Sequence, residues 1–156
     1  MISISVTRAL LFILVACLCS PLAHAGPAED AEAAFSRFFP AMAARNQAEV
    51  AAMFAPDAQF YGTVSPELVT TPEGILEYFA VGLGGPGSTR GTPLQLTSTA
   101  LSDDVVLIAG MWTFDRTLDG ETTVGKLLRI TAVLEKRDDR WLVVQFHNSP
   151  RPAPAP

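Results

Sequence analysis

The sequence predicts an α+β fold in which helices pack against the concave face of a curved antiparallel sheet. In the first third of the 156-residue chain, apolar residues recur at three- and four-residue spacing, which is typical of amphipathic helices. From Leu94 onward, segments rich in Val, Ile, Thr, Leu and aromatic residues follow one another with short turns between them. Helices followed by a series of strands indicate one domain, which we place at residues 26–150.

The first helix is expected from about Pro27 to Arg45. Pro40 should kink or split it, because proline lacks a backbone N–H and clashes with the preceding turn. Asn46 starts a second helix, with Glu49 at the spacing of a capping box. Thr71-Pro72 starts a third, since threonine caps a helix and proline fits its first position.

Strands are expected at 58–63, 94–101, 105–118, 122–136 and 141–148. Asp119-Gly120 is a strong signal for a two-residue hairpin loop, and Asp138-Asp139 marks the next turn. Gly110 lies in mid-strand, where a bulge or bend would help the sheet to curve.

The segment from Gly82 to Pro93 is a glycine-rich loop. Its Gly82-x-Gly84-x-x-Gly87 spacing matches the dinucleotide fingerprint, but that fingerprint has to follow a strand and open a helix. Here a helix precedes it and a strand follows, so we interpret the segment as a mobile loop or pocket lid. The sequence therefore predicts no cofactor.

Residues 1–25 are predicted to be a secretory signal peptide. Arg8 precedes an apolar run from Ala9 to Cys19, and Ala23-His24-Ala25 supplies a small-x-small cleavage site. The run is too short to span a membrane, which takes roughly 20 apolar residues. We expect cleavage near Ala25 and a periplasmic or secreted protein.

A lipoprotein is the alternative, because Leu14-Val15-Ala16-Cys17 resembles a bacterial lipobox and would anchor the chain through a lipid at Cys17. The chain has two cysteines, Cys17 and Cys19, and both lie inside the predicted signal. A chain cleaved after Ala25 can therefore form neither a disulfide nor a thiolate metal site.

The charge balance bears on the kind of partner. A net charge of −5 with only two lysines argues against binding of nucleic acid or of anionic lipid surfaces. One histidine in the predicted mature chain, without cysteines, cannot build a structural zinc site. Residues 151–156 form a Pro-Ala tail that we expect to be disordered.

Arg129 is the first candidate for a functional side chain. If the Asp119-Gly120 loop closes a two-residue hairpin, Arg129 lies opposite Gly110, on the same concave face as Trp112 and Thr131. An arginine on an otherwise apolar face is costly unless it is paired or points to an anion. Arg129 would then clamp a carboxylate or similar group; a structural ion pair is the alternative.

The C-terminal strands carry Arg129-Ile130-Thr131, then Trp141, then Phe146-His147-Asn148-Ser149 and Pro152. This pattern resembles the signature of the calcium/calmodulin-dependent kinase II association domain and its bacterial SnoaL-like relatives, in the nuclear transport factor 2-like superfamily. The stretch from Met53 to Ala58 is similar to the family's exit from its second helix.

The resemblance implies a cone-shaped, cystatin-like fold with a pocket between sheet and helices, and commonly a homodimer through the sheet. Members include isomerases, dehydratases, cyclases, assembly hubs and pocket proteins without demonstrated activity, so the fold alone does not choose a function. Gln145 stands where the family often has the first of two histidines, which leaves His147.

His147 could act as a general base or as a hydrogen-bond donor; a histidine bonded to the backbone is the alternative. A two-residue loop at Asp138-Asp139 would put His147 opposite Ile130, and one extra loop residue would put it opposite Thr131, beside Arg129. The resemblance favours the second register, in which the two side chains share a pocket.

Tyr61 and Gln145 complete the candidate site. Phe60 and Tyr61 are neighbours on a predicted strand, so one of the two side chains points inward. An inward Tyr61 would be either a hydroxyl donor in the pocket or a core aromatic. Gln145 precedes His147 by two residues and could add an amide contact. The predicted ligand-binding residues are thus Arg129, Tyr61, Trp112, Gln145 and Thr131, with His147 as the candidate catalytic residue.

These observations predict an exported pocket protein that binds a small, partly apolar molecule with an anionic or carbonyl group. One alternative is an acid–base isomerase or dehydratase that uses His147. The other is a non-catalytic association module. Apolar strand residues predicted to face outward need burial, which a homodimer or higher oligomer would provide: Leu128, Ile130, Ala132, Leu134, Leu142, Val144 and Phe146.

Overall fold

The computed structural model of the chain describes residues 26–125 and 127–153, so the predicted signal peptide lies outside the described residues. The elements are α1 (Pro27–Ser36), α2 (Phe38–Ala43), α3 (Gln47–Ala51), β1 (Phe54–Tyr61), α4 (Pro72–Leu83), β2 (Ser88–Ala100), β3 (Val105–Leu118), β4 (Glu121–Thr123), β5 (Leu127–Arg137) and β6 (Arg140–Pro150). None of the described helices is long and apolar enough to cross a membrane.

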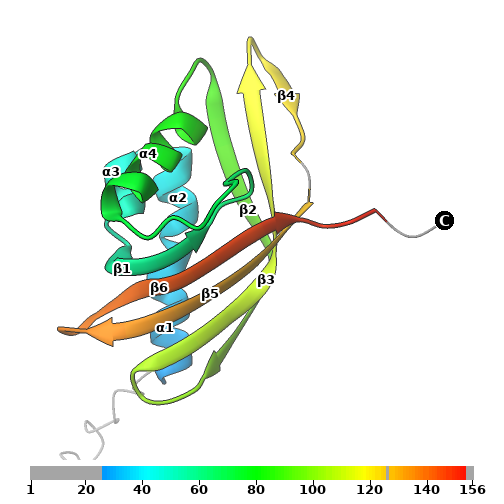
Figure 1. The fold of residues 1–156 in the computed structure, drawn as a ribbon. Helices are drawn as coiled ribbons and strands as arrows, with labels where there is room; N and C mark the ends of the chain where they lie inside the picture. Colours follow the sequence, from blue (N-terminus) through cyan, green and yellow to red (C-terminus); the bar gives the residue numbers. More distant parts are fainter. Residues whose placement is uncertain (1–25, 126, 154–156) are drawn as a thin grey trace, which may run out of the picture.

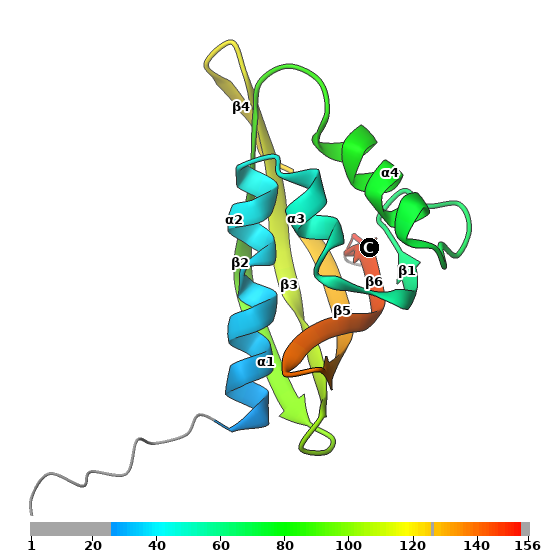
Figure 2. The same ribbon diagram turned by 90° about the vertical axis from the view of Figure 1, so that its left-hand side faces the viewer.

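The six strands form one curved sheet in the order β1-β6-β5-β3-β2, with β4 paired to the end of β3 (Figure 1). All pairs are antiparallel except β1 with β6, which run parallel. The sequence predicted only antiparallel pairs. All four helices lie on one face of the sheet (Figure 2), which confirms the predicted α+β architecture.

The helix boundaries follow from their end residues. Arg37 separates α1 from α2, three residues before Pro40, because proline removes a hydrogen bond and clashes with the preceding turn. The Asn46 side chain accepts from the Glu49 amide at the start of α3. The Thr71 side chain accepts from the Gly74 amide at the start of α4. The predicted split and both predicted caps are confirmed.

An aromatic cluster fills the space between helices and sheet. Phe60 of β1 and Phe146 of β6 stack with ring centroids 5.1 Å apart, and both are buried. Phe38 of α2 packs against Phe146 at 5.9 Å and against Trp112 of β3 at 5.8 Å. Rings of this size dominate core burial, so the cluster fixes the helices on the sheet.

The register between β3 and β5 differs from the predicted one by one residue. The Asp119-Gly120 hairpin pairs Leu118 with Glu121, as predicted. Further along, Arg116 pairs with Thr123 but Thr113 pairs with Leu127, so the register shifts by one residue between these two pairs. The extra residue is a bulge, and it reverses the face of every residue that follows it.

Gly125 makes this bulge possible. Its amide donates to Oδ1 of Asp115 at 2.9 Å, and a Cβ at this position would overlap the carbonyl group of Phe114. Beyond the bulge Arg129 pairs with Met111 and not with Gly110. The prediction that Arg129 lies on the concave face was therefore wrong.

Because of the bulge, the faces predicted for several residues of β5 and β6 were also wrong. Residues that were expected to face outward are buried in the core: Leu128, Ile130, Ala132, Leu134 and Phe146. Gly110 lies beside a register shift between Pro93 and Gln95 of β2, so the bulge expected near it is present in the neighbouring strand.

The β5–β6 hairpin turns at Asp138-Asp139, as predicted, but the loop has two residues and not the extra one of the preferred register, since Arg137 pairs with Arg140. A second register shift follows within the strands, because Leu134 pairs with Val143 but Val133 pairs with Gln145. His147 consequently lies opposite Thr131. The extra residue sits in β6 and not in the loop, where the sequence analysis had placed it.

We expect Gly125→Ala to lower the free energy of unfolding by about 1–3 kcal/mol, because the added methyl overpacks the bulge. Urea denaturation followed by circular dichroism measures this. Thr123→Ala, at an exposed position of β4, is the matched control and should change stability by less than about 0.5 kcal/mol. A Gly125→Ala protein as stable as the wild type would contradict the bulge.

Candidate functional site

An apolar pocket lies between the helices and the concave face of the sheet. Its volume is about 320 Å³, at the lower end of the roughly 300–1,000 Å³ that is usual for small-molecule sites. Helices α2 and α4, the loop after β1, and strands β3, β5 and β6 supply its walls, which are largely aromatic and aliphatic: Phe38, Phe79, Trp112, Phe114, Leu128 and Phe146.

The polar end of the pocket is a chain of three lining side chains, Trp112, Asn148 and Thr63. The indole Nε1–H of Trp112 donates to Oδ1 of Asn148 at 2.9 Å, and Nδ2 of Asn148 donates to Oγ1 of Thr63 at 2.5 Å. An indole N–H can only donate, so the Asn148 atom beside it has to be the carbonyl oxygen. Trp112 thereby fixes the orientation of the buried amide.

This orientation determines what Thr63 can offer to a ligand. Its oxygen already accepts from Asn148, and among residues 26–125 and 127–153 its hydroxyl hydrogen has no protein acceptor. A hydroxyl in this state is a donor for a carbonyl or hydroxyl oxygen in the pocket. Hydrogen bonds that run in one direction polarise one another, which strengthens the last donor of the chain.

The residues that line the pocket in the described parts of the chain are uncharged. Asp, Glu, His, Lys and Arg are all absent from this described lining. Nor do three His, Cys, Asp or Glu side chains gather anywhere in the described parts of the chain as a group that could hold a metal ion. Burying an unpaired charge is costly, so the pocket is suited to a neutral molecule.

Asp57, at the start of the strand that leads to the pocket loop, is occupied elsewhere. Arg137 binds it through Oδ1 at 2.6 Å and Oδ2 at 3.3 Å, and Arg137 also contacts Glu135 at 2.6 Å. The hydrogen bonds from Arg137 hold the pKa of the Asp57 carboxyl below its usual range. Asp57 therefore belongs to a surface ion-pair network and not to the pocket.

The chain matches known proteins over most of its length. The family model described as SnoaL-like domain matches residues 31–154. The chain belongs to the SnoaL-like family. A candidate calcium/calmodulin-dependent protein kinase II association domain from Xanthomonas campestris is 34% identical to it, with a TM-score of 0.71 over 80% of this chain and 87% of that chain. A search of curated protein sequences finds no match.

Two further solved structures share the fold at lower identity. An NTF2-like protein with a cystatin-like fold from Novosphingobium aromaticivorans is 13% identical, with a TM-score of 0.68 over 81% of this chain and 83% of that chain. A candidate dehydratase of the NTF2-like family from Streptomyces avermitilis is 15% identical, with a TM-score of 0.72 over 81% and 97%. They confirm the nuclear transport factor 2-like, cystatin-like fold that the resemblance implied.

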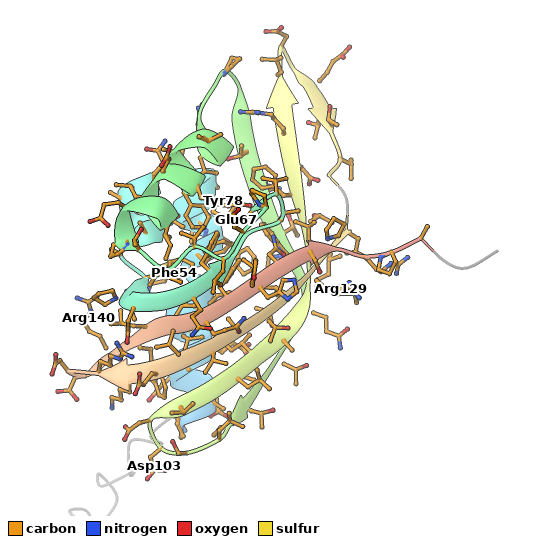
Figure 3. All side chains as sticks on the ribbon, viewed as in Figure 1. Phe54, Glu67, Tyr78, Asp103, Arg129 and Arg140 are labelled. Carbon is orange, nitrogen blue, oxygen red and sulfur yellow. The ribbon has the colours of Figure 1, made fainter. Side chains whose placement is uncertain are left out.

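The six predicted site residues of this SnoaL-like domain are divided between two faces of the sheet. Trp112 lines the pocket. The other five lie on the face away from the helices, which we call the outer face: Arg129, Thr131, Gln145, His147 and Tyr61. Figure 3 shows Arg129 on the side of the sheet away from Tyr78, a pocket residue of α4. A role of the five in ligand binding stays a prediction.

The outer-face residues do form a group. Tyr61, His147 and Thr131 lie side by side on β1, β6 and β5, and the rings of Tyr61 and His147 are 6.0 Å apart. Arg129 donates to the Ser149 hydroxyl at 3.4 Å. His147 and Arg129 lie on the same face of the sheet, as the preferred register predicted, but this face does not line the pocket.

Sequence reasoning missed Asn148, Thr63 and Tyr78. Asn148 follows His147 directly, so strand alternation puts the two side chains on opposite faces. The motif drew attention to the histidine, whereas the pocket receives the asparagine. Thr63 lies in a loop and Tyr78 lies on α4. No local sequence pattern shows that these two segments lie near β6.

The glycine-rich loop after α4 is held at the end of the pocket wall. Arg45, with a φ of 56°, donates through Nε to the carbonyl of Leu83 at 2.7 Å and through Nη1 to that of Gly87 at 2.8 Å. A third hydrogen bond runs from Nη2 to the carbonyl of Gly85. A cation at a helix C-terminus is favourable, so Arg45 fixes the position of Leu83, which lines the pocket.

Proposed function

We propose that this SnoaL-like domain binds a small, neutral, largely apolar molecule with one carbonyl or hydroxyl oxygen. The hydrogen-bonded chain from Trp112 through Asn148 to Thr63 carries this proposal, because it places one directed donor at the end of an otherwise apolar pocket. In a largely apolar site, a small number of polar groups determines how the ligand is oriented.

The sequence analysis left an anionic or a carbonyl group open for the ligand. Arg129, the side chain expected to bind an anion, is exposed on the outer face. An anion in the pocket would be buried beside Asn148 and Thr63 without a counter-charge, which is unfavourable. The lining thus supports the carbonyl or hydroxyl ligand.

Binding without turnover is the activity that this lining supports best. Acid–base isomerisation or dehydration requires a titratable group within hydrogen-bond reach of the reacting atoms. Among the described lining residues only Tyr78 has a titratable side chain. His147, the candidate base, lies on the outer face opposite Thr131.

Thr63→Val tests the proposed donor, since it removes the hydroxyl and keeps the shape. We expect the affinity for hexanone to fall roughly three- to tenfold, as for the loss of one neutral hydrogen bond of about 1 kcal/mol. Isothermal titration calorimetry measures the dissociation constant.

The matched control is Thr131→Val, the same change on the outer face. It should leave the affinity unchanged. If Thr131→Val weakened binding and Thr63→Val did not, the ligand site would lie on the outer face, with the residues that the sequence first indicated.

We also propose that the protein is exported and forms a homo-oligomer through the outer face. The signal pattern of residues 1–25 supports export. Oligomerisation is supported by the relative from Xanthomonas campestris, which is named for an association domain. Half-buried Met111 of β3 and Val133 of β5 lie on the outer face, which also carries Tyr61 of β1 with 42% of its surface exposed. Such apolar exposure favours a second copy as partner.

A native mass spectrum of the full chain expressed in a Gram-negative host tests both parts. We expect a polypeptide mass that corresponds to cleavage after Ala25, in complexes of at least two subunits. A lipid-modified subunit that begins at Cys17 would establish the lipoprotein alternative. A monomer at micromolar concentration would contradict the oligomer.

A further inference from the structure

A surface groove beside α4 adjoins the pocket. Its volume is about 580 Å³, and it runs between the loop that precedes α4 and the exposed side of that helix. Apolar side chains are unusually exposed along it: Val64 is 79% exposed, Val81 78% and Leu68 40%. Glu67 of the loop and Tyr78 of the helix, both labelled in Figure 3, line the groove, and Tyr78 also lines the pocket.

Three residues line both cavities, namely Val64, Tyr78 and Gly82. Gly62 lies under the Tyr78 ring, which a Cβ on Gly62 would overlap. The backbone therefore lets the ring lie against the loop, at the border between the two cavities. The groove and the pocket therefore adjoin at these three residues.

Gly82 is exposed and lies at the border of the two cavities. A Cβ at Gly82 would meet no atom within 4 Å, and its φ lies outside the left-handed region. Neither close packing nor backbone strain requires glycine there, and glycine inside a helix costs about 1 kcal/mol relative to alanine. A side chain at Gly82 would enter open space at the border of the two cavities.

We propose that groove and pocket form one elongated site, and that the groove receives the hydrocarbon chain of a neutral long-chain ketone or alcohol. This inference rests on the proposed function, in which Thr63 binds the ligand oxygen. The described lining of the groove contains Glu67 and Glu77 and no basic residue. Acidic side chains along the path disfavour a fatty acid and any other anionic chain.

The test is a series of straight-chain methyl ketones, from hexanone to tridecanone, titrated calorimetrically into the full-length protein. For the wild type, affinity should rise about fourfold for each added methylene, as expected for burial of hydrocarbon, and continue to rise beyond the length that the pocket alone holds. Gly82→Trp should block the border between the two cavities. It should weaken tridecanone binding at least tenfold more than it weakens hexanone binding.

Two controls separate this effect from changes in folding. Leu76→Trp puts the same bulk on an exposed part of α4 outside both cavities and should change neither affinity. Val81→Glu adds a charge in the groove at a highly exposed position, which folding tolerates, and should weaken tridecanone alone.

The outcomes distinguish the two proposals. If hexanone binds and affinity stops rising with chain length, or if Gly82→Trp and Val81→Glu leave tridecanone binding intact, the groove is not part of the site and the pocket proposal stands. If no ketone of any length binds, the proposed function fails and this inference fails with it.

Discussion

The faces of β5 depend on one extra residue between Thr123 and Leu127. A side-chain period of two means that a shift of one residue exchanges the two faces of a strand. With the bulge at Gly125, Leu128 and Ile130 enter the core and Arg129 points outward. Without it, a guanidinium would lie in the centre of the aromatic cluster, where an unpaired charge is strongly unfavourable.

The second register shift, in β6, completes the pocket. It places Phe146 and Asn148 on the concave face and His147 between them on the outer face. Asn148 then lies within hydrogen-bond distance of Trp112 of β3 and of Thr63 in the loop after β1. Three elements that are distant in sequence thus meet at one buried amide, and the two register shifts direct Arg129 and His147 to the outer face.

The sequence predicted the helices, their caps and the positions of both hairpin turns, because these depend on local patterns such as Thr71-Pro72 and Asp119-Gly120. It predicted the strands less completely, since Ser88 to Pro93 were expected to be loop and form the first part of β2. It did not predict the bulge at Gly125, since this glycine is identified as necessary only by the Phe114 carbonyl of the neighbouring strand. One undetected bulge was enough to place Arg129 in the pocket. The family motif indicated the right part of β6, but strand alternation decided that Asn148, and not His147, faces the ligand space.

The most direct test of the neutral hydrogen-bonded pocket is a ¹⁵N–¹H spectrum that resolves the two tryptophan side chains. Trp112 donates its indole N–H within the pocket, whereas Trp141 lies at the other end of β6 and provides an internal reference. When hexanone is added, we expect the Trp112 indole signal to shift and the Trp141 signal to stay in place, while hexanoate at neutral pH shifts neither. A Trp112 signal that is unchanged at saturating hexanone, or that responds to hexanoate instead, would contradict the account.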